Sequence, residues 1–492
     1  MEVNRQKETG SNSAAAGSYS AIPPLVVDLD GTLLRTDLLH ESLLRLLKQR
    51  PWALLMVPVW LLRGRVNLKR KLSELVHLNC AVLPIHEEFI EWLRSEKKRG
   101  RSLVLATASD QNLAARAVAH LELFDRVLGS RGSRNLKGHN KIEAIIQECG
   151  PEFDYAGNSQ SDQSVWRASR QAILVNAHRS VEALARRSAN VTRVFPPAGG
   201  RLKAMIRSLR IYQWVKNLLI FVPAFTSHEG VHGPVIVKSM LGFLALSMCA
   251  SGVYVANDLL DLEEDRQHSS KRDRPFASGE CSILTGVLVG GLSMSAGLGL
   301  GAWIGNGLLL VLLLYVFLAS LYSLCLKKML LLDVLTLAIL YTVRVIVGHV
   351  LTGILFSAWL SSFMFFLFLS LAFSKRATEL IKFSQSGGDV VPGRGYSRVD
   401  LPVIMTSGIC SGFISSLVLA LYINSDAVKG LYRRPELLWA IMPVLLYYIG
   451  RLWVMCGRGK LDDDPIIYSA KSPSTYYVAA LILVVVIAAT RG

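Results

Sequence analysis

Residues 257–265 read Asn-Asp-Leu-Leu-Asp-Leu-Glu-Glu-Asp, and they follow directly on a long, largely apolar run. On an α-helix, Asn257, Asp261 and Asp265 are spaced four residues apart, so their oxygen atoms project from one face, with Asp258 beside them. Carboxylates this close repel one another unless a cation lies between them. The spacing therefore predicts a cluster of hard oxygen ligands, which suits Mg²⁺ and the phosphate groups that share its coordination.

The residues after this acidic stretch argue against its simplest explanation, a solvated acidic helix end. A basic run follows at once: His268, Lys271, Arg272 and Arg274. Arginine and lysine beside a metal-bound phosphate are what a polyanionic substrate requires. Two ions held by the carboxylates could clamp a pyrophosphate and help it to leave.

The apolar residues are unevenly distributed along the 492-residue chain, of which 51% is hydrophobic. Residues 1–200 have the character of a soluble domain, whereas later blocks are long and apolar enough to cross a bilayer as helices. We predict nine spans, at about 209–226, 235–256, 282–304, 306–325, 330–352, 357–374, 402–423, 437–456 and 474–490. The all-α part of the chain is thus expected at 207–492.

Basic residues follow the even-numbered spans. By the positive-inside rule, those loops and the N-terminus are predicted to face the cytoplasm. The protein is accordingly expected in the inner membrane. Only the loop with Lys429, Arg433 and Arg434 runs against this rule. The net charge of +17 is explained better by basic residues at span ends and by contact with anionic lipid than by nucleic-acid binding, because the basic residues do not gather in one stretch of the sequence. Seven widely spaced cysteines indicate neither disulfides nor a zinc site. The sequence leaves the oligomeric state open, a homo-oligomer included.

The N-terminal part shows an α/β pattern with a parallel sheet. After a polar stretch, 1–20, that is expected to be disordered, buried strands are predicted near 25–27, 102–106, 153–156 and 172–175, with helices between them. This domain is expected over 21–180. A helical insert at about 37–100 would form a cap, and within it the apolar run 52–62 is taken as a cap helix in preference to a segment on the bilayer surface. Residues 181–206 are expected to be a linker.

Motifs at the strand ends resemble those of the haloacid-dehalogenase (HAD) superfamily of phosphatases. Asp28-Leu29-Asp30-Gly31-Thr32 matches its DxDGT signature. The resemblance implies that Asp28 attacks a phosphate monoester and that Asp30 protonates the leaving group. It further implies that Thr107 binds phosphate, with the stabilising lysine at Lys137, slightly preferred, or at Lys141. Mg²⁺ would be held by Asp28, Asp30, Asn158 and Asp162; Asn158 replaces the commoner aspartate.

The membrane part resembles the UbiA superfamily of intramembrane prenyltransferases. The pattern NDxxDxxxD followed by a Lys/Arg-rich loop is its first aspartate-rich motif, and nine helices match its fold. The usual second acidic pair, after the sixth helix, has no clean copy here. That loop is expected to carry Lys375, Arg376, Glu379, Arg394, Tyr396 and Asp400 instead.

A narrower resemblance is to the polyprenyl-phosphate phosphoribosyltransferases within this superfamily. It rests on residues 212–217, 257–279 and 322–327 with Asp333 and Arg344, and on Asp464-Pro465. It implies Mg²⁺ and donor pyrophosphate at Asn257, Asp258, Asp261 and Asp265, with Asp258 and Asp261 catalytic. The phosphate-binding residues it implies are Lys216, Lys271, Arg274, Lys327 and Arg344, to which we add Lys375 and Arg376 as candidates. The donor would be phosphoribosyl pyrophosphate and the acceptor a polyprenyl phosphate.

Some of these basic residues have a plainer explanation. Lys327 could serve only as an anchor at the membrane interface. Lys216 and Arg344 are harder to explain in that way, because both lie within apolar stretches, where an ionisable residue is costly.

The joining of the two motif sets favours one function over the alternatives. Transfer of phosphoribose leaves a 5-phosphate on the lipid, which a phosphatase could remove to give a precursor of an arabinose donor. An aromatic prenyltransferase that uses an isoprenyl diphosphate, with an accessory or inactive HAD domain, is the first alternative. A non-catalytic lipid-binding membrane protein is the second.

Overall fold

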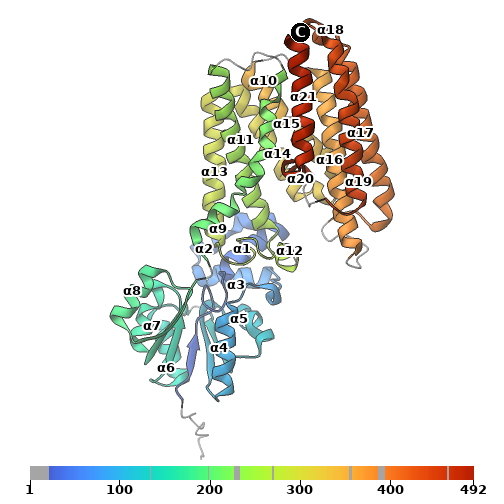
Figure 1. Ribbon diagram of the computed structural model, residues 1–492. Helices are drawn as coiled ribbons and strands as arrows, with labels where there is room; N and C mark the ends of the chain where they lie inside the picture. The colour runs from blue at the N-terminus through green and yellow to red at the C-terminus, as the bar shows by residue number, and fades with distance from the viewer. Residues whose placement is uncertain are drawn as a thin grey trace, which may run out of the picture. The chain divides into compact units, whose positions relative to one another are not determined.

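The computed structural model describes residues 22–132, 134–197, 199–226, 233–268, 271–353, 357–385, 394–461 and 465–491. The expected disorder at 1–20 and the motif residue Asp464 lie outside these ranges. The chain forms two compact units (Figure 1). Unit 1 contains the chain up to Arg201, with Arg266–Asp273 and Ala277–Ile283; unit 2 contains Leu202–Asp265, Arg274–Phe276 and the chain from Leu284 onward.

Unit 1 is built on a six-stranded parallel sheet with the strand order β3-β2-β1-β4-β5-β6. The strands are β1 (Leu25–Val27), β2 (Leu103–Asp110), β3 (Arg126–Ser130), β4 (Asp154–Gly157), β5 (Gln171–Val175) and β6 (Val191–Phe195). Helices α4 (Glu87–Lys98) and α5 (Gln111–Val118) pack in one core cluster of the sheet. Helices α6 (His139–Cys149), α7 (Gln163–Ala168) and α8 (Arg179–Ser188) pack in the other. The sheet is therefore covered on both faces, and the expected α/β fold class is confirmed.

Two strands were not expected from the sequence. Strand β3 pairs with β2, and β6 pairs with β5 inside the range that was expected to be a linker. Both are outer strands of the sheet, and in β6 only Phe195 is fully buried. An outer strand that buries a single side chain lacks the apolar run that reveals a central strand.

The helical insert after β1 is shorter than expected. Its helices α1 (Leu38–Gln49), η1 (Pro51–Met56), α2 (Val57–Leu62) and α3 (Arg65–Leu75) pack around a cluster of their own. Helix α4, also inside the expected range 37–100, instead buries Phe89, Ile90 and Leu93 in the core of the sheet. The insert that could cap the sheet is therefore α1–α3.

A buried ion pair joins the insert to a segment from much later in the chain. Glu41 on α1 accepts hydrogen bonds from the Arg266 guanidinium at 2.6 and 3.1 Å, and from the Thr36 hydroxyl at 2.7 Å. Both charged side chains are only 6% exposed. This pair lies wholly in unit 1, to which residues 266–273 belong.

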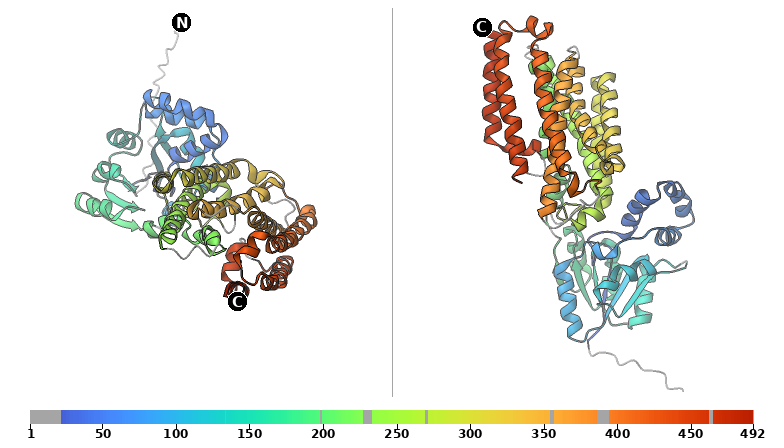
Figure 2. Two further views of the ribbon diagram at one scale, coloured as in Figure 1. Left: turned by 90° about the horizontal axis from the view of Figure 1, so that it is seen from above. Right: turned by 90° about the vertical axis from the view of Figure 1, so that its right-hand side faces the viewer.

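Unit 2 is a bundle of long apolar helices, drawn side by side in Figure 2. Among the described residues, eight helical segments are long and apolar enough to cross a membrane. They are Gly233–Leu260, Ile283–Ile304, Asn306–Leu324, Leu332–Thr352, Ala358–Gln385, Arg398–Ile423, Pro435–Gly457 and Pro473–Thr490. In order, the first five are α11, α13, α14, α15 and α16. The last three contain α17 (Leu401–Ile423), α19 (Ile441–Gly457) and α21 (Pro473–Arg491). Each corresponds to an expected span.

Two features of the helical part differ from expectation. The first expected span, 209–226, is a 3-10 helix, η5 (Ile211–Phe221), followed by the short α10 (Val222–Thr226). Its polar residues Lys216 and Asn217 are buried, and Asn217 is hydrogen-bonded to neighbouring segments. The second difference concerns α16, which continues to Gln385 and takes Lys375, Arg376 and Glu379 out of the expected loop. Charged residues with good helix propensity extend a helix beyond its apolar part at little cost.

Candidate functional site

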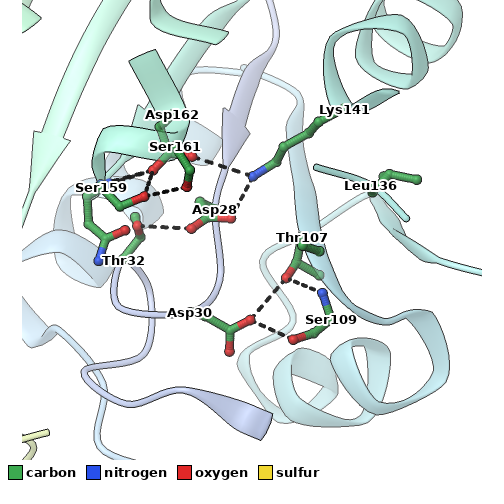
Figure 3. Close-up of polar contacts among 12 residues, drawn as sticks. Asp28, Asp30, Thr32, Thr107, Ser109, Leu136, Lys141, Ser159, Ser161 and Asp162 are labelled. Atoms are coloured by element: carbon green, nitrogen blue, oxygen red, sulfur yellow. Dashed lines mark hydrogen bonds and ion pairs between the residues drawn. The ribbon is translucent and has the colours of Figure 1, made fainter. Parts of the chain in front are cut away.

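The first candidate site lies at the carboxyl ends of β1, β2 and β4, where parallel sheets place ligands (Figure 3). Asp28 directly follows β1 and is 8% exposed. Its carboxylate accepts a hydrogen bond from the Thr32 hydroxyl at 3.4 Å and is 2.6 Å from the Lys141 ammonium. Gly31 permits the turn, because its φ of 77° lies in the left-handed region and a Cβ there would meet the Asn158 side chain.

Lys141 connects Asp28 to a buried chain of polar groups. Its ammonium is also 2.5 Å from the Tyr155 hydroxyl, which donates to Asp162 at 2.9 Å. The other Asp162 oxygen accepts from the backbone N–H groups of Asn158 and Ser159 and from the Ser159 hydroxyl. Asp162 therefore fixes the loop after β4 and, through Tyr155, the position of Lys141.

The structure places Lys141, and not Lys137, beside Asp28. Lys137, which the sequence slightly favoured, is exposed, whereas Lys141 is buried against Asp28. Lys137 precedes α6 and its N-cap residue Gly138, whereas Lys141 lies in the first turn of the helix, and only the fold shows which of them reaches Asp28.

If Asp28 attacks a phosphate monoester as predicted, Lys141→Met should lower that turnover roughly a hundredfold, because it removes a positive charge beside the nucleophile. Lys137→Met is the matched control and should retain activity within about twofold. Steady-state hydrolysis of p-nitrophenyl phosphate by the full-length chain measures both. Equal losses in the two variants would contradict the assignment.

Asp30 does not share the hydrogen bonds of Asp28. One oxygen of Asp30 accepts from the backbone N–H of Leu38 at 2.9 Å, and the other from the hydroxyls of Thr107 and Ser109 at 3.3 and 2.6 Å (Figure 3). Thr107, expected to bind phosphate, thus lies beside Asp30. Burial raises the pKa of Asp30, which favours the protonated form that a general acid needs.

The loops around Asp28 carry the residues that are predicted to hold Mg²⁺. Asp28, Asn158 and Asp162 come from adjacent strand ends, but Asp162 already accepts four hydrogen bonds. In the described part of the chain no group of three or more His, Cys, Asp or Glu side chains is arranged to hold a metal ion. Binding of Mg²⁺ by Asp28, Asp30, Asn158 and Asp162 therefore stays a prediction.

The pH dependence of this site follows from the pKa of Asp28. Burial raises that pKa to about 7 despite the opposing charge of Lys141. A carboxylate that attacks phosphate must be ionised. If Asp28 has this predicted role, we expect kcat/KM at limiting Mg²⁺ to rise about tenfold per pH unit up to about pH 7 and then to level off. A cation beside Asp28 favours its ionised form, so more Mg²⁺ should move this limb to lower pH. A pH profile that does not move with Mg²⁺ concentration would contradict the prediction.

Lys69 is a site residue that sequence reasoning missed. It lies on α3 of the insert, and its ammonium donates to the Ala108 carbonyl at 2.6 Å, between Thr107 and Ser109 on β2. Partial burial lowers its pKa, which the charges of Asp30 and Asp37 partly offset. Only the fold brings residues this far apart in the sequence together, so no local pattern could have shown it.

The second candidate site lies in unit 2, at the end of α11. The backbone N–H of Asp261 bonds to the Asn257 carbonyl at 2.9 Å, and that of Asp265 to the Asp261 carbonyl at 2.8 Å. Helical hydrogen bonding therefore continues from α11 into α12 (Leu262–Gln267), as the spacing of the motif predicts. Asn257, Asp261 and Asp265 lie one turn apart along the helix.

Each of the three aspartates of this motif contacts a basic side chain. The Arg274 guanidinium bridges Asp258 and Asp265, at 3.1 and 2.6 Å from one nitrogen. Arg210 also bonds Asp258, and the Lys327 ammonium is 2.6 Å from both oxygens of Asp261. The Arg274 guanidinium thus lies between two of these carboxylates, where a divalent cation is predicted. Asn257, Asp258, Asp261 and Asp265 are the residues that would hold such cations.

A second polar cluster is buried in the same bundle. Arg376 on α16 forms ion pairs with Asp333 on α15 and with Glu379, and donates to the Tyr322 hydroxyl at 2.8 Å. Arg394 donates to the same hydroxyl and to the Lys327 carbonyl, at 3.1 and 3.2 Å. Lys327 thereby links the two clusters. Sequence reasoning named Arg376 and Asp333 but could not pair them.

The remaining basic candidates are distributed differently. Arg344 is buried and bonds neutral groups, the Asn217 side chain at 2.9 Å and the Tyr315 hydroxyl at 3.2 Å. Lys216 and Arg344 both lie over the Tyr341 ring. Lys375 is half-buried beside Arg376. Lys271 belongs to unit 1, and its role in binding phosphate stays a prediction.

Fold and site together define a polytopic membrane protein that carries clustered carboxylates and basic side chains in its helical bundle. The sequence matches the UbiA prenyltransferase family over residues 218–458. The chain belongs to this family of membrane transferases.

Several relatives match the chain over different lengths. The uncharacterized protein y4nM of Sinorhizobium fredii is 36% identical over 93% of this chain and 89% of its own length. The nodulation protein NoeC of Azorhizobium caulinodans is 31% identical over 54% of this chain and 86% of its own length. A decaprenyl-phosphate phosphoribosyltransferase of Mycobacterium tuberculosis is 32% identical over 40% of this chain and 67% of its own length. A solved structure of a UbiA homologue from Archaeoglobus fulgidus bound to GPP and Mg²⁺ is 17% identical, covers 58% of this chain and 99% of its own, and has a TM-score of 0.44.

Proposed function

We propose that unit 2 transfers 5-phosphoribosyl from phosphoribosyl pyrophosphate to a polyprenyl phosphate, and that unit 1 is a HAD-like phosphatase that removes the 5-phosphate from the lipid product. The observation that carries this proposal is the pairing of Asp258, Asp261 and Asp265 with Arg210, Arg274 and Lys327. One cluster thus holds both cation ligands and phosphate-binding groups. The similarity to the mycobacterial phosphoribosyltransferase supports the choice of substrates.

In the transfer step, an oxygen of the lipid phosphate forms a bond to the anomeric carbon of ribose while the bond from that carbon to pyrophosphate breaks. The lipid phosphate is already a nucleophile, so no general base is required. Mg²⁺, when bound, neutralises the departing pyrophosphate. Arg210, Arg274 and Lys327 would exchange their carboxylate partners for phosphate oxygens, which they bind by charge-assisted hydrogen bonds.

The second cluster supports a donor with an additional phosphate over an isoprenyl diphosphate. At the position of the family's second acidic motif, Arg376 and Arg394 converge on Tyr322, and Lys375 lies next to Arg376. Such a basic site suits the 5-phosphate of phosphoribosyl pyrophosphate. Lys216, Lys271 and Arg344 are proposed as further phosphate-binding residues.

In unit 1, Asp28 would attack the phosphorus of the ribose 5-phosphate while Asp30 protonates the departing 5-oxygen. Water, deprotonated by Asp30, would then hydrolyse the aspartyl phosphate and release phosphate. Lys69 and Lys141 would approach the substrate from the insert and from α6. Both sites are proposed to face the cytoplasm from the inner membrane, with the phosphatase domain over about 21–180 and the transferase domain over 207–492.

The decisive experiment incubates the purified full-length protein with ribose-labelled phosphoribosyl pyrophosphate, polyprenyl phosphate and Mg²⁺. Label should enter the lipid phase, first with and then without the 5-phosphate, and EDTA should abolish its entry. Label that stays in the aqueous phase, together with turnover of an isoprenyl diphosphate on an aromatic acceptor, would favour the alternative transferase.

A further inference from the structure

An apolar surface on the insert of unit 1 has no role in either proposed reaction. It consists of Trp52, Leu55, Met56, Val59, Leu61 and Leu62 on η1 and α2, which we call the apolar patch. Its three most exposed members, Trp52, Leu55 and Leu62, are 82, 78 and 89% exposed. Contiguous apolar groups of this kind on a protein surface usually mark a contact with another surface.

The opposite side of the same segment is held firmly by the insert. Leu54, Val57 and Trp60 are half-buried and pack on the cluster that includes Leu46 of α1 and Leu72 of α3. The segment is therefore two-sided, with one side serving the fold and the other facing outward. Its 12 residues, Pro51–Leu62, are too few to cross a bilayer.

Charge around the patch indicates what covers it. Residues 42–73 contain eight Lys or Arg and no Asp or Glu. Arg50 and Arg63, which flank the patch directly, and Arg65 are all exposed. An exposed tryptophan and leucines bordered by basic residues are typical of segments that lie in the headgroup region of anionic membranes.

A second copy of this chain is a poorer partner. A two-fold contact through the patch would bring Arg50, Arg63 and Arg65 of one copy against the same residues of the other, and like charges oppose such a contact. A bilayer, by contrast, is always present, because unit 2 spans it and the chain passes from unit 1 to unit 2 between Arg201 and Leu202. Tethering gives even a weak surface interaction a high effective concentration.

We propose that the apolar patch lies in the headgroup region of the bilayer and holds the site of unit 1 at the lipid surface. The patch leads directly into α3, which carries Lys69 to the side of Asp30. A membrane-bound insert would thus present the site to a phosphate monoester carried on a lipid. This last consequence rests on the proposed phosphatase function, whereas contact with the bilayer does not.

Photocrosslinking tests the contact directly in the full-length protein. Benzoylphenylalanine is placed at Leu62, or at the exposed Lys98 of α4 as a matched control, and the protein is reconstituted in nanodiscs that contain clickable phosphatidylglycerol. We expect at least a fivefold greater yield of lipid adducts from position 62. Equal yields of lipid adducts from positions 62 and 98 would overturn the proposal. So would crosslinks from position 62 to protein alone.

An activity comparison separates this inference from the proposed function. The double variant Leu55→Asp/Leu62→Asp should hydrolyse soluble p-nitrophenyl phosphate at the normal rate but dephosphorylate the lipid product about tenfold more slowly. Equal rates on the lipid product in the variant and the unchanged protein would overturn delivery of a lipid substrate by the patch. If neither protein hydrolyses any phosphate monoester, the phosphatase function fails, while lipid adducts from position 62 still support membrane contact.

Discussion

Replacing Asp261 with alanine is expected to lower phosphoribosyl transfer by roughly a thousandfold, the largest loss we expect from any single change in unit 2. Asp261 is one of the proposed cation ligands, and both of its carboxylate oxygens lie 2.6 Å from the Lys327 ammonium. Its loss removes a ligand for the ion and leaves the Lys327 charge uncompensated. Transfer of ribose label to polyprenyl phosphate, measured at saturating Mg²⁺, gives the size of the effect.

Glu264→Gln is the matched control, because Glu264 is an exposed acidic residue of the same motif, outside the i, i+4, i+8 face. It should retain transfer within about twofold. Asp261→Asn keeps the shape of the side chain and should lose nearly as much activity as the alanine variant. Near-normal transfer by either Asp261 variant, in protein that is folded and monodisperse, would refute the proposed cation site.

Asp28→Asn is expected to reduce dephosphorylation by at least about a thousandfold, since it removes the attacking carboxylate. Transfer in unit 2 should continue, so the lipid that still carries the 5-phosphate should accumulate. Chromatography of the labelled lipid fraction distinguishes the two products. Glu143→Gln on α6 is a suitable control, because Glu143 forms only exposed ion pairs with Arg134 and His139. Release of the 5-phosphate at a normal rate by Asp28→Asn would remove unit 1 from the proposed pathway.

The sequence predicted those features that depend on local pattern. Apolar runs located eight helices to within a few residues, except at the C-terminal end of α16, and four buried strands followed from short runs of β-branched and aliphatic residues. The spacing of the oxygen ligands in the acidic motif could be read directly, because helical periodicity places Asn257, Asp261 and Asp265 on one face. Such signals need no knowledge of tertiary structure.

Features that depend on partners distant in the sequence could not be predicted in this way. Lys137 and Lys141 are equivalent by pattern, and only the packing of α6 brings one of them to Asp28. Arg210 reaches Asp258 across 48 positions, and Lys69 reaches Ala108 across 39. The outer strand β6 could not be recognised from the sequence, because its exposed residues are as polar as those of a loop.

The buried pair of Glu41 and Arg266 bears on how the molecule can be dissected. Unit 1 is completed by residues that the ribosome adds only after the first long apolar helix. A fragment that stops at Arg201 would lose the guanidinium that neutralises Glu41, and breaking a buried ion pair in this way costs roughly 3–5 kcal/mol when the remaining charge stays buried. Unit 1 and unit 2 are thus not two consecutive, separable domains. Truncating the gene after Arg201 would yield an incomplete unit 1.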